Sequence, residues 1–203
     1  MAASKFKIAL IISSTRTPRV GPPVATWVAS TIAAARPSSA VLETVDLADY
    51  PLPLSPAGSV IPAKITTPGG YGDAQVDAFS LKIAGYDGFV FVTPQYNWSI
   101  PGVLKVSLDH LFHEWAGKPA VIVSYGGRGG AKAAAHLREI WQGVRGGDVA
   151  GSVELTISGP GMEKAQSKGE LVEAVTEAWE KEKKAEAVVE SFAKLVDLVE
   201  NKY

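Results

Sequence analysis

The chain has 203 residues, of which 46% are hydrophobic, and its 20 basic and 21 acidic side chains give a formal net charge of −1. This length suits one α/β core, so we expect a single domain over residues 1–203. The balanced charge provides no drive towards nucleic acid or an anionic membrane, and the absence of cysteine excludes disulfides, thiolate catalysis and cysteine-ligated metal.

The segment from Met1 to Ile8 runs directly into a strand-like stretch and lacks the long apolar run of a signal peptide. Elsewhere no apolar run reaches the roughly 20 residues needed to cross a bilayer. We therefore expect a cytoplasmic protein without a membrane partner.

Short apolar runs rich in β-branched residues predict strands that are buried on both faces, which is typical of a parallel sheet. Such runs occupy residues 7–13, 41–45, 88–93 and 119–124, and a more alternating run at 151–157 predicts an edge strand. Apolar residues at helical spacing predict helices between the strands. The expected helices lie from Val24 to Ile32, over 73–84, from Leu104 to Trp115, over 130–144 and over most of 170–201.

Strands that alternate with helices imply right-handed crossovers and an open, doubly wound sheet. Five strands in this length favour a flavodoxin-like α/β fold with strand order 2-1-3-4-5 and helices on both faces. Ligands of this fold bind beyond the carboxyl ends of the strands. We therefore look for chemistry after the first, third and fourth strands. The proline- and glycine-rich stretch 51–72 reads as a long loop, and such loops usually carry function.

The loop after the first strand contains Ser14, Arg16 and Val20 and leads into a helix. A phosphate placed there would meet free N–H groups, hydroxyl donors and a guanidinium. The loop has neither the lysine of a Walker sequence nor the glycine pattern of a dinucleotide fold, which argues against NTP hydrolysis. A polar capping turn is the alternative explanation of the same residues.

The loop after the third strand combines stiff prolines, flat aromatic rings and amides that can bond the edge of a heterocycle. Its residues are Pro94, Gln95, Tyr96, Asn97, Trp98 and Pro101. They form a wall that suits a flat ring, although a structural turn with buried aromatics has the same composition.

The loop after the fourth strand reads Ser124-Tyr125-Gly126-Gly127-Arg128-Gly129-Gly130. Glycines let the backbone approach a ligand closely and direct N–H groups at it, so a pyrimidine-like ring edge fits here. Taken alone, the glycines also fit a flexible loop. The three loops converge at one end of the predicted sheet, and together they indicate a pocket for FMN.

Several stretches resemble the NADPH-dependent FMN reductases, most closely the fungal cytosolic FMN-dependent quinone reductases. The likeness extends from Lys7 to about Ala150, and its most specific stretches are Pro94 to Trp98, His113 to Trp115, Gly117 to Ala120 and Val123 to Gly127. The family often has a serine near Val20, and Asn-Ala where this chain has Val106-Ser107.

The resemblance implies FMN held non-covalently, with NADPH or NADH as electron donor and a homodimer as the working form. It places the phosphate at Ser14, Arg16 and the turn that follows to Val20, and the ring against Pro94, Gln95, Tyr96 and Asn97. The outer ring edge is expected near Ser124, Tyr125, Gly126 and Gly127. Tyr96, Trp98 and Tyr125 are also candidates for shaping the substrate cavity.

The predicted function is two-electron, ping-pong hydride transfer from NAD(P)H to a quinone or a similar small acceptor. FMN performs the chemistry, so we assign no catalytic residue. The rival functions are a flavodoxin-type electron carrier and an adaptor that senses the flavin redox state. Within the enzyme class, azo compounds, chromate or free flavin are alternative acceptors.

His110, His113 and Glu114 are spaced so that a metal site is conceivable, but no further protein ligand is evident. We favour packing or a dimer interface for these residues and expect no metal.

Overall fold

The computed structural model describes residues 6–35, 39–55 and 59–202. The expectation for the N-terminal segment falls mainly on Met1 to Lys5 and lies outside the described residues, as does the part of the 51–72 loop at 56–58. None of the helices in the described ranges is long and apolar enough to span a membrane.

Five parallel strands form one sheet, in the predicted order β2-β1-β3-β4-β5. The strands are β1 (Phe6–Ile12), β2 (Ala40–Asp46), β3 (Gly88–Pro94), β4 (Ala120–Gly126) and β5 (Val149–Thr156). Every residue of β3 is buried, whereas β5 alternates between buried and accessible positions, as an edge strand does. The predicted strands and their order are confirmed.

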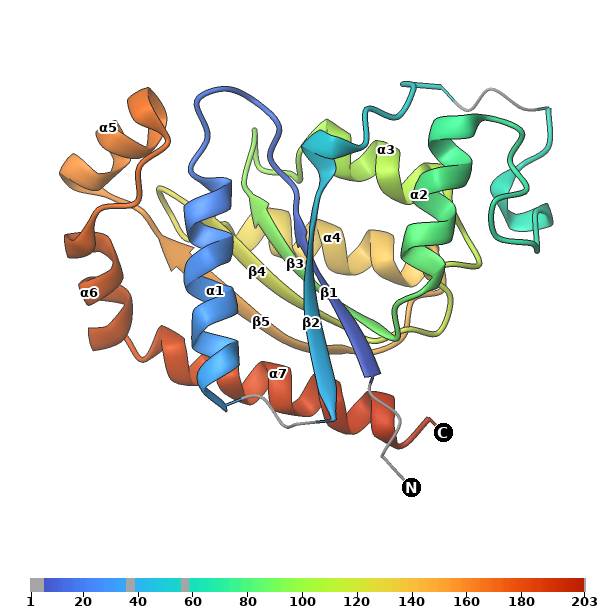
Figure 1. The fold of residues 1–203 in the computed structure, drawn as a ribbon. Helices are drawn as coiled ribbons and strands as arrows, with labels where there is room; N and C mark the ends of the chain where they lie inside the picture. Colours follow the sequence, from blue (N-terminus) through green and yellow to red (C-terminus); the bar gives the residue numbers. More distant parts are fainter. Residues whose placement is uncertain (1–5, 36–38, 56–58, 203) are drawn as a thin grey trace.

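Helices cover both faces of this sheet (Figure 1). One face carries α1 (Gly21–Ala35) and α7 (Lys184–Glu200), and the other carries α2 (Ala74–Ala84), α3 (Gly102–His110) and α4 (Ala131–Gly143). Successive residues of β1 point to opposite faces: Ile8 and Leu10 join the core under α1 and α7, and Ala9 and Ile11 join the other core. Burial on both faces explains why the strand reads as a continuous apolar run.

The helix predicted from Leu104 to Trp115 ends earlier than expected. α3 stops at His110, and the residues that follow form a turn. The buried carboxylate of Glu114 accepts the Phe112 N–H (3.3 Å) and the hydroxyl of Tyr71 (2.9 Å). The carboxylate thus accepts an N–H that a backbone carbonyl would accept if the helix continued. The apolar residues after His110 therefore lie in a turn, although they are buried as their spacing predicts.

The single helix predicted over 170–201 is wrong. The chain forms α5 (Gly159–Lys168), which was not expected, then α6 (Glu173–Lys181) and α7. Gly169 (φ 69°) ends α5, and Lys183 (φ 57°) separates α6 from α7, since a left-handed residue breaks the helical path. The indole N–H of Trp179 donates to the Thr156 carbonyl (2.7 Å) and fixes α6 at the end of β5.

The segment 51–72 has little regular structure in its described part: η2 (Pro62–Lys64) is one short 3-10 turn, and η1 (Leu47–Asp49) precedes the segment. Two histidines hold it in place. His110 Nε2–H donates to the Pro53 carbonyl (2.7 Å), and His113 Nε2–H donates to the Ala63 carbonyl (2.9 Å). These contacts agree with the packing role favoured from the sequence.

Lys118 supports the end of α2 from the start of β4. Its Nζ donates to the carbonyls of Ile83 (3.3 Å) and Ala84 (3.1 Å), which belong to the last turn of α2 and lack partners within the helix. Burial lowers the pKa of Lys118 to about 8, against the opposing attraction of Asp87 and Glu114.

We predict that Lys118→Met changes how stability depends on pH. Between pH about 8 and 10.5, the folded protein has released a proton that the unfolded chain still holds, so this group adds stability as the pH rises. The free energy of unfolding of the wild type relative to the variant should therefore increase across this window, by up to about 1.4 kcal/mol per pH unit. Urea unfolding at several pH values measures it, and a difference that does not change with pH contradicts the lowered pKa.

Candidate functional site

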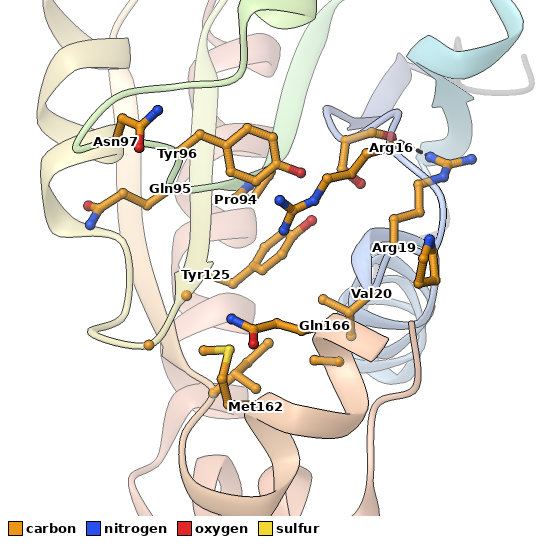
Figure 2. A pocket seen from close by; sticks show the side chains of 16 residues that line it. Arg16, Arg19, Val20, Pro94, Gln95, Tyr96, Asn97, Tyr125, Met162 and Gln166 are labelled. Atoms are coloured by element: carbon orange, nitrogen blue, oxygen red, sulfur yellow. Dashed lines mark hydrogen bonds between the residues drawn. The ribbon is translucent and has the colours of Figure 1, made fainter. Parts of the chain in front are cut away.

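The loops after β1, β3 and β4 enclose a cavity of about 520 Å³ at the carboxyl edge of the sheet (Figure 2). This volume falls within the range of about 300–1,000 Å³ that is typical of small-molecule sites. All the residues predicted for the binding site, except Trp98 and Ser124, line it. The lining consists of Ser14, Arg16, Pro18, Arg19, Val20, Pro94, Gln95, Tyr96, Asn97, Tyr125, Gly126, Gly127, Ile157, Met162, Ala165 and Gln166.

Arg19 fixes the shape of the β1–α1 loop. Its guanidinium donates two hydrogen bonds to the carboxylate of Asp46 at the end of β2 (2.9 and 2.7 Å), and a third to the backbone carbonyl of Ser14. The hydrogen bonds to Asp46 raise the pKa of Arg19. The charge of Arg19 is thus compensated by Asp46, and its role at this site is to hold the loop.

Arg16, by contrast, reaches into the cavity without a carboxylate partner. Its guanidinium carbon lies 4.6 Å from the ring centroid of Tyr96, and the ion pairs found in the described residues do not include it. This cation–π contact links the loop after β1 to the loop after β3. Arg16 therefore brings an uncompensated positive charge to the start of α1.

Ser14 and Tyr125 bring two buried hydroxyls to the same end of the cavity. Their exposed fractions are 1% and 3%, and neither hydroxyl has a hydrogen-bond partner of ordinary geometry in the described structure. A Cβ on Gly21, the first residue of α1, would lie 2.9 Å from the Tyr125 hydroxyl and closer still to Ser14 Oγ. An unpaired buried hydroxyl costs about 1–3 kcal/mol, which a ligand with acceptor oxygens relieves.

Asn97 and Trp98 are the central residues of a tight turn after β3. Tyr96 and Ser99 close it with two backbone hydrogen bonds (2.9 Å each), and the central residues have positive φ values of 49° and 67°. Such values are tolerated by asparagine and are uncommon for bulky residues. The turn leaves Trp98 69% exposed, with Lys132 Nζ 5.6 Å from the centroid of one of its rings. Its side chain lies outside the cavity lining, so its role in ligand binding stays a prediction.

Gln95 lines the cavity and also caps a helix. Its amide oxygen accepts the N–H groups of Lys132 (3.0 Å) and Ala133 (3.3 Å) at the start of α4, where Gly130 offers no capping side chain. The oxygen is therefore engaged, and the NH₂ group is the part of the amide that is left for a ligand.

Ser124 turns away from the cavity. Its hydroxyl donates to the Gly129 carbonyl (3.0 Å), which closes the loop after β4 on itself. Gly129 and Gly130 have φ values of 76° and 93°, and a Cβ on Gly130 would lie 2.8 Å from that of Ser124. Glycine is required at these positions by the loop itself, whereas Gly126 and Gly127 are the glycines that line the cavity.

Six lining residues were not predicted from the sequence: Pro18, Arg19, Ile157, Met162, Ala165 and Gln166. The last four of these residues follow β5. The carboxyl end of β5 lies at the same edge of the sheet as the carboxyl ends of β3 and β4. The sequence predicts chemistry after the first, third and fourth strands only, and the residues of this segment are mostly apolar and carry no recognisable chemistry. The weak signal available was the place of Ile157 at the end of a predicted strand.

Comparisons with known proteins agree with this geometry. The sequence profile of the family described as NADPH-dependent FMN reductase matches residues 6–159. The chain is 46% identical over 134 residues to an NAD(P)H-dependent FMN reductase of Schizosaccharomyces pombe. The matched stretch is 66% of this chain and 64% of the length of that protein, just under two thirds. It is 34% identical over 195 residues to an NAD(P)H-dependent FMN reductase of a Nectria species, covering 95% of this chain and 96% of the relative.

More distant relatives share shorter stretches or the fold. A quinone reductase of Escherichia coli is 45% identical over 73 residues, which is 33% of this chain and 39% of that protein. The solved structure of FerB from Paracoccus denitrificans, a flavoenzyme NAD(P)H:(acceptor) oxidoreductase, matches with a TM-score of 0.61 at 21% identity, over 97% of this chain and 98% of that one. At this identity the likeness shows the fold, which is the flavodoxin-like one that was predicted.

Gly21→Ala is predicted to destabilise the folded chain, whereas Gly102→Ala is not. Both glycines begin a helix, α1 and α3, so the gain in helix propensity is matched. A Cβ at position 21 overlaps Ser14 and Tyr125, while one at position 102 meets nothing within 4 Å. Overpacking of this kind costs about 1–3 kcal/mol. Urea unfolding of both variants measures the difference, and equal effects would refute the close approach at Gly21.

Proposed function

The chain belongs to the NADPH-dependent FMN reductase family, and on this premise we propose that it binds FMN non-covalently and passes two electrons from NADPH or NADH to a quinone or similar small acceptor. One observation carries the proposal. At the start of α1 the cavity presents two buried, unpaired hydroxyls, Ser14 and Tyr125, together with the uncompensated charge of Arg16. These groups are what a phosphate requires.

The phosphate end of the site is the β1–α1 loop. The first N–H groups of α1 have no partners within the helix and lie at the positive end of its dipole, so they favour an anion. Val20 replaces the serine that the family often has near this position, so we assign the polar contacts to Ser14 and Arg16. Arg19 acts by positioning the loop through Asp46.

The ring end of the site is the wall formed by Pro94, Gln95, Tyr96 and Asn97. Gly126 and Gly127 line the cavity beside this wall and let a flat ring approach the backbone. Met162 and Gln166 of α5 line the same cavity from the third side (Figure 2). The side chains on this wall orient and enclose a planar ligand, and they exclude water from one of its faces.

FMN held by these residues would supply the hydride and two-electron transfer chemistry. The protein needs no acid or base for this transfer, and we assign no catalytic residue. We propose that the donor and the acceptor use this cavity in turn, so that the oxidised nucleotide leaves before the acceptor binds. This order produces ping-pong kinetics.

A quinone is the proposed acceptor because the chain shares 45% identity over 73 residues with a quinone reductase. Azo compounds, chromate and free flavin are acceptors that the same open wall would admit. An electron carrier is less consistent with the chain because its 20 basic and 21 acidic residues nearly cancel, whereas carriers use strong charge to dock with partners. A flavin-sensing adaptor has no specific observation in its favour.

We further propose that two copies of the chain associate in the cytosol. Leu54, Val60 and Ile61 are at least half exposed, on the segment held down by His110 and His113. Exposed apolar side chains on an anchored segment fit a protein interface. Light scattering on the purified protein tests this proposal, and a monomer at micromolar concentration would refute it.

Arg16→Ala is predicted to weaken FMN binding by about 10- to 100-fold, the usual effect of losing hydrogen bonds to a charged group. Quenching of flavin fluorescence on titration gives the dissociation constant. Arg138→Ala is the matched control, because Arg138 lines a different cavity, with Gly117 and Lys202. If the two variants bind FMN equally well, the phosphate assignment is wrong.

The FMN-loaded protein is predicted to oxidise NADPH or NADH rapidly with a simple benzoquinone. Initial rates at several fixed quinone concentrations should give parallel double-reciprocal lines, as a ping-pong order requires. Reduction that depends on an added reductase would favour the carrier, and intersecting lines would show that donor and acceptor bind together.

A further inference from the structure

Tyr125 is the last residue but one of β4, and its place in the sequence predicts that it lies at the outer edge of the ring. The structure sends its side chain elsewhere. The ring is buried in the core shared with Val24 and Ala25 of α1, and its hydroxyl lies 2.9 Å from the position of a Cβ on Gly21. Figure 2 shows the ring extending from β4 towards Arg16. The hydroxyl therefore sits at the first turn of α1, far along the side chain from the β4 backbone.

We propose that the hydroxyls of Tyr125 and Ser14 act as a pair of buried ligands of the FMN phosphate, so that Tyr125 belongs to the phosphate end of the site. This inference rests on the proposed binding of FMN in this cavity.

The chemistry of the two groups fits this role. A phosphate offers only acceptor oxygens at neutral pH, so it needs donors, and both hydroxyls are free to donate. Burial raises the pKa of the Tyr125 phenol, which keeps its proton available. Because the pair is shielded from water, each hydrogen bond to a charged oxygen is stronger than it would be at the surface.

The lack of hydrogen-bond partners for these two hydroxyls also affects stability. The neighbouring Ser14 hydroxyl opposes the rise in the pKa of Tyr125, but neither hydroxyl has a hydrogen-bond partner of ordinary geometry among the described residues, so removing the Tyr125 hydroxyl should cost the empty protein little stability. A tyrosine with a purely structural role behaves in the opposite way. Tyr86 is such a residue: it is equally buried, and its hydroxyl donates to the carboxylate of Glu43 (3.0 Å).

The test compares Tyr125→Phe with the matched control Tyr86→Phe. Each protein is stripped of flavin, its urea unfolding is measured, and it is titrated with FMN and with riboflavin, which lacks the phosphate. Tyr125→Phe should leave the stability of the empty protein unchanged or raised, and weaken FMN binding by about tenfold or more with riboflavin binding unchanged. Tyr86→Phe should lower the stability and leave both affinities as they are.

A second readout covers the case of riboflavin binding too weakly to titrate. The phosphorus NMR signal of bound FMN should shift in Tyr125→Phe, while the visible absorption bands of the bound flavin stay in place. Unchanged FMN affinity, an equal loss of FMN and riboflavin, or shifted absorption bands with an unmoved phosphorus signal would each overturn the inference. Failure of the wild type itself to bind FMN would instead overturn the proposed function.

Discussion

The parallel pairing of β1 with β2 and β3 is the constraint on which the cavity depends. Its register places Ile12 beside Asp46, so the carboxylate that holds Arg19 stands next to the point where the β1–α1 loop leaves the sheet. The pairing of β3 with β4 likewise sets Pro94 beside Tyr125. The ring wall and the buried phenol thus start from adjacent backbone positions. A one-residue slip would turn each side chain to the opposite face and separate these groups.

Two arginines in one loop have different surroundings, and this suits them to different parts of the proposed phosphate site. Arg19 is compensated by Asp46 and bonded to the Ser14 carbonyl, so it stabilises the loop whether or not a ligand is present. Arg16 lies against the face of Tyr96, and the ion pairs among the described residues do not include it, so its charge is available. The hydroxyls of Ser14 and Tyr125 are held ready but unpaired, at some cost to the stability of the empty protein. These groups are therefore already in place for the proposed phosphate.

Much of the fold could be predicted because burial on both faces leaves a direct mark: Val90 and Ile122 lie in apolar runs that only a parallel sheet explains. What escaped prediction depends on partners distant in sequence. Arg19 finds Asp46 27 residues away, and Glu114 replaces the helical partner of Phe112 and so ends α3 early. The place of Tyr125 was predicted from its backbone, although its hydroxyl lies beside Gly21 at the far end of a long side chain. The contribution of Met162 and Gln166 was hidden because the segment after β5 carries no motif.

The central claim is that this cavity holds FMN by its phosphate end at the start of α1. The most direct test is to reconstitute the flavin-free protein with FMN and measure the bound flavin after gel filtration, with riboflavin in parallel. The account predicts one FMN per chain, a yellow protein, and markedly weaker retention of riboflavin. A colourless protein that retains neither flavin, or one that retains riboflavin as tightly as FMN, would contradict it.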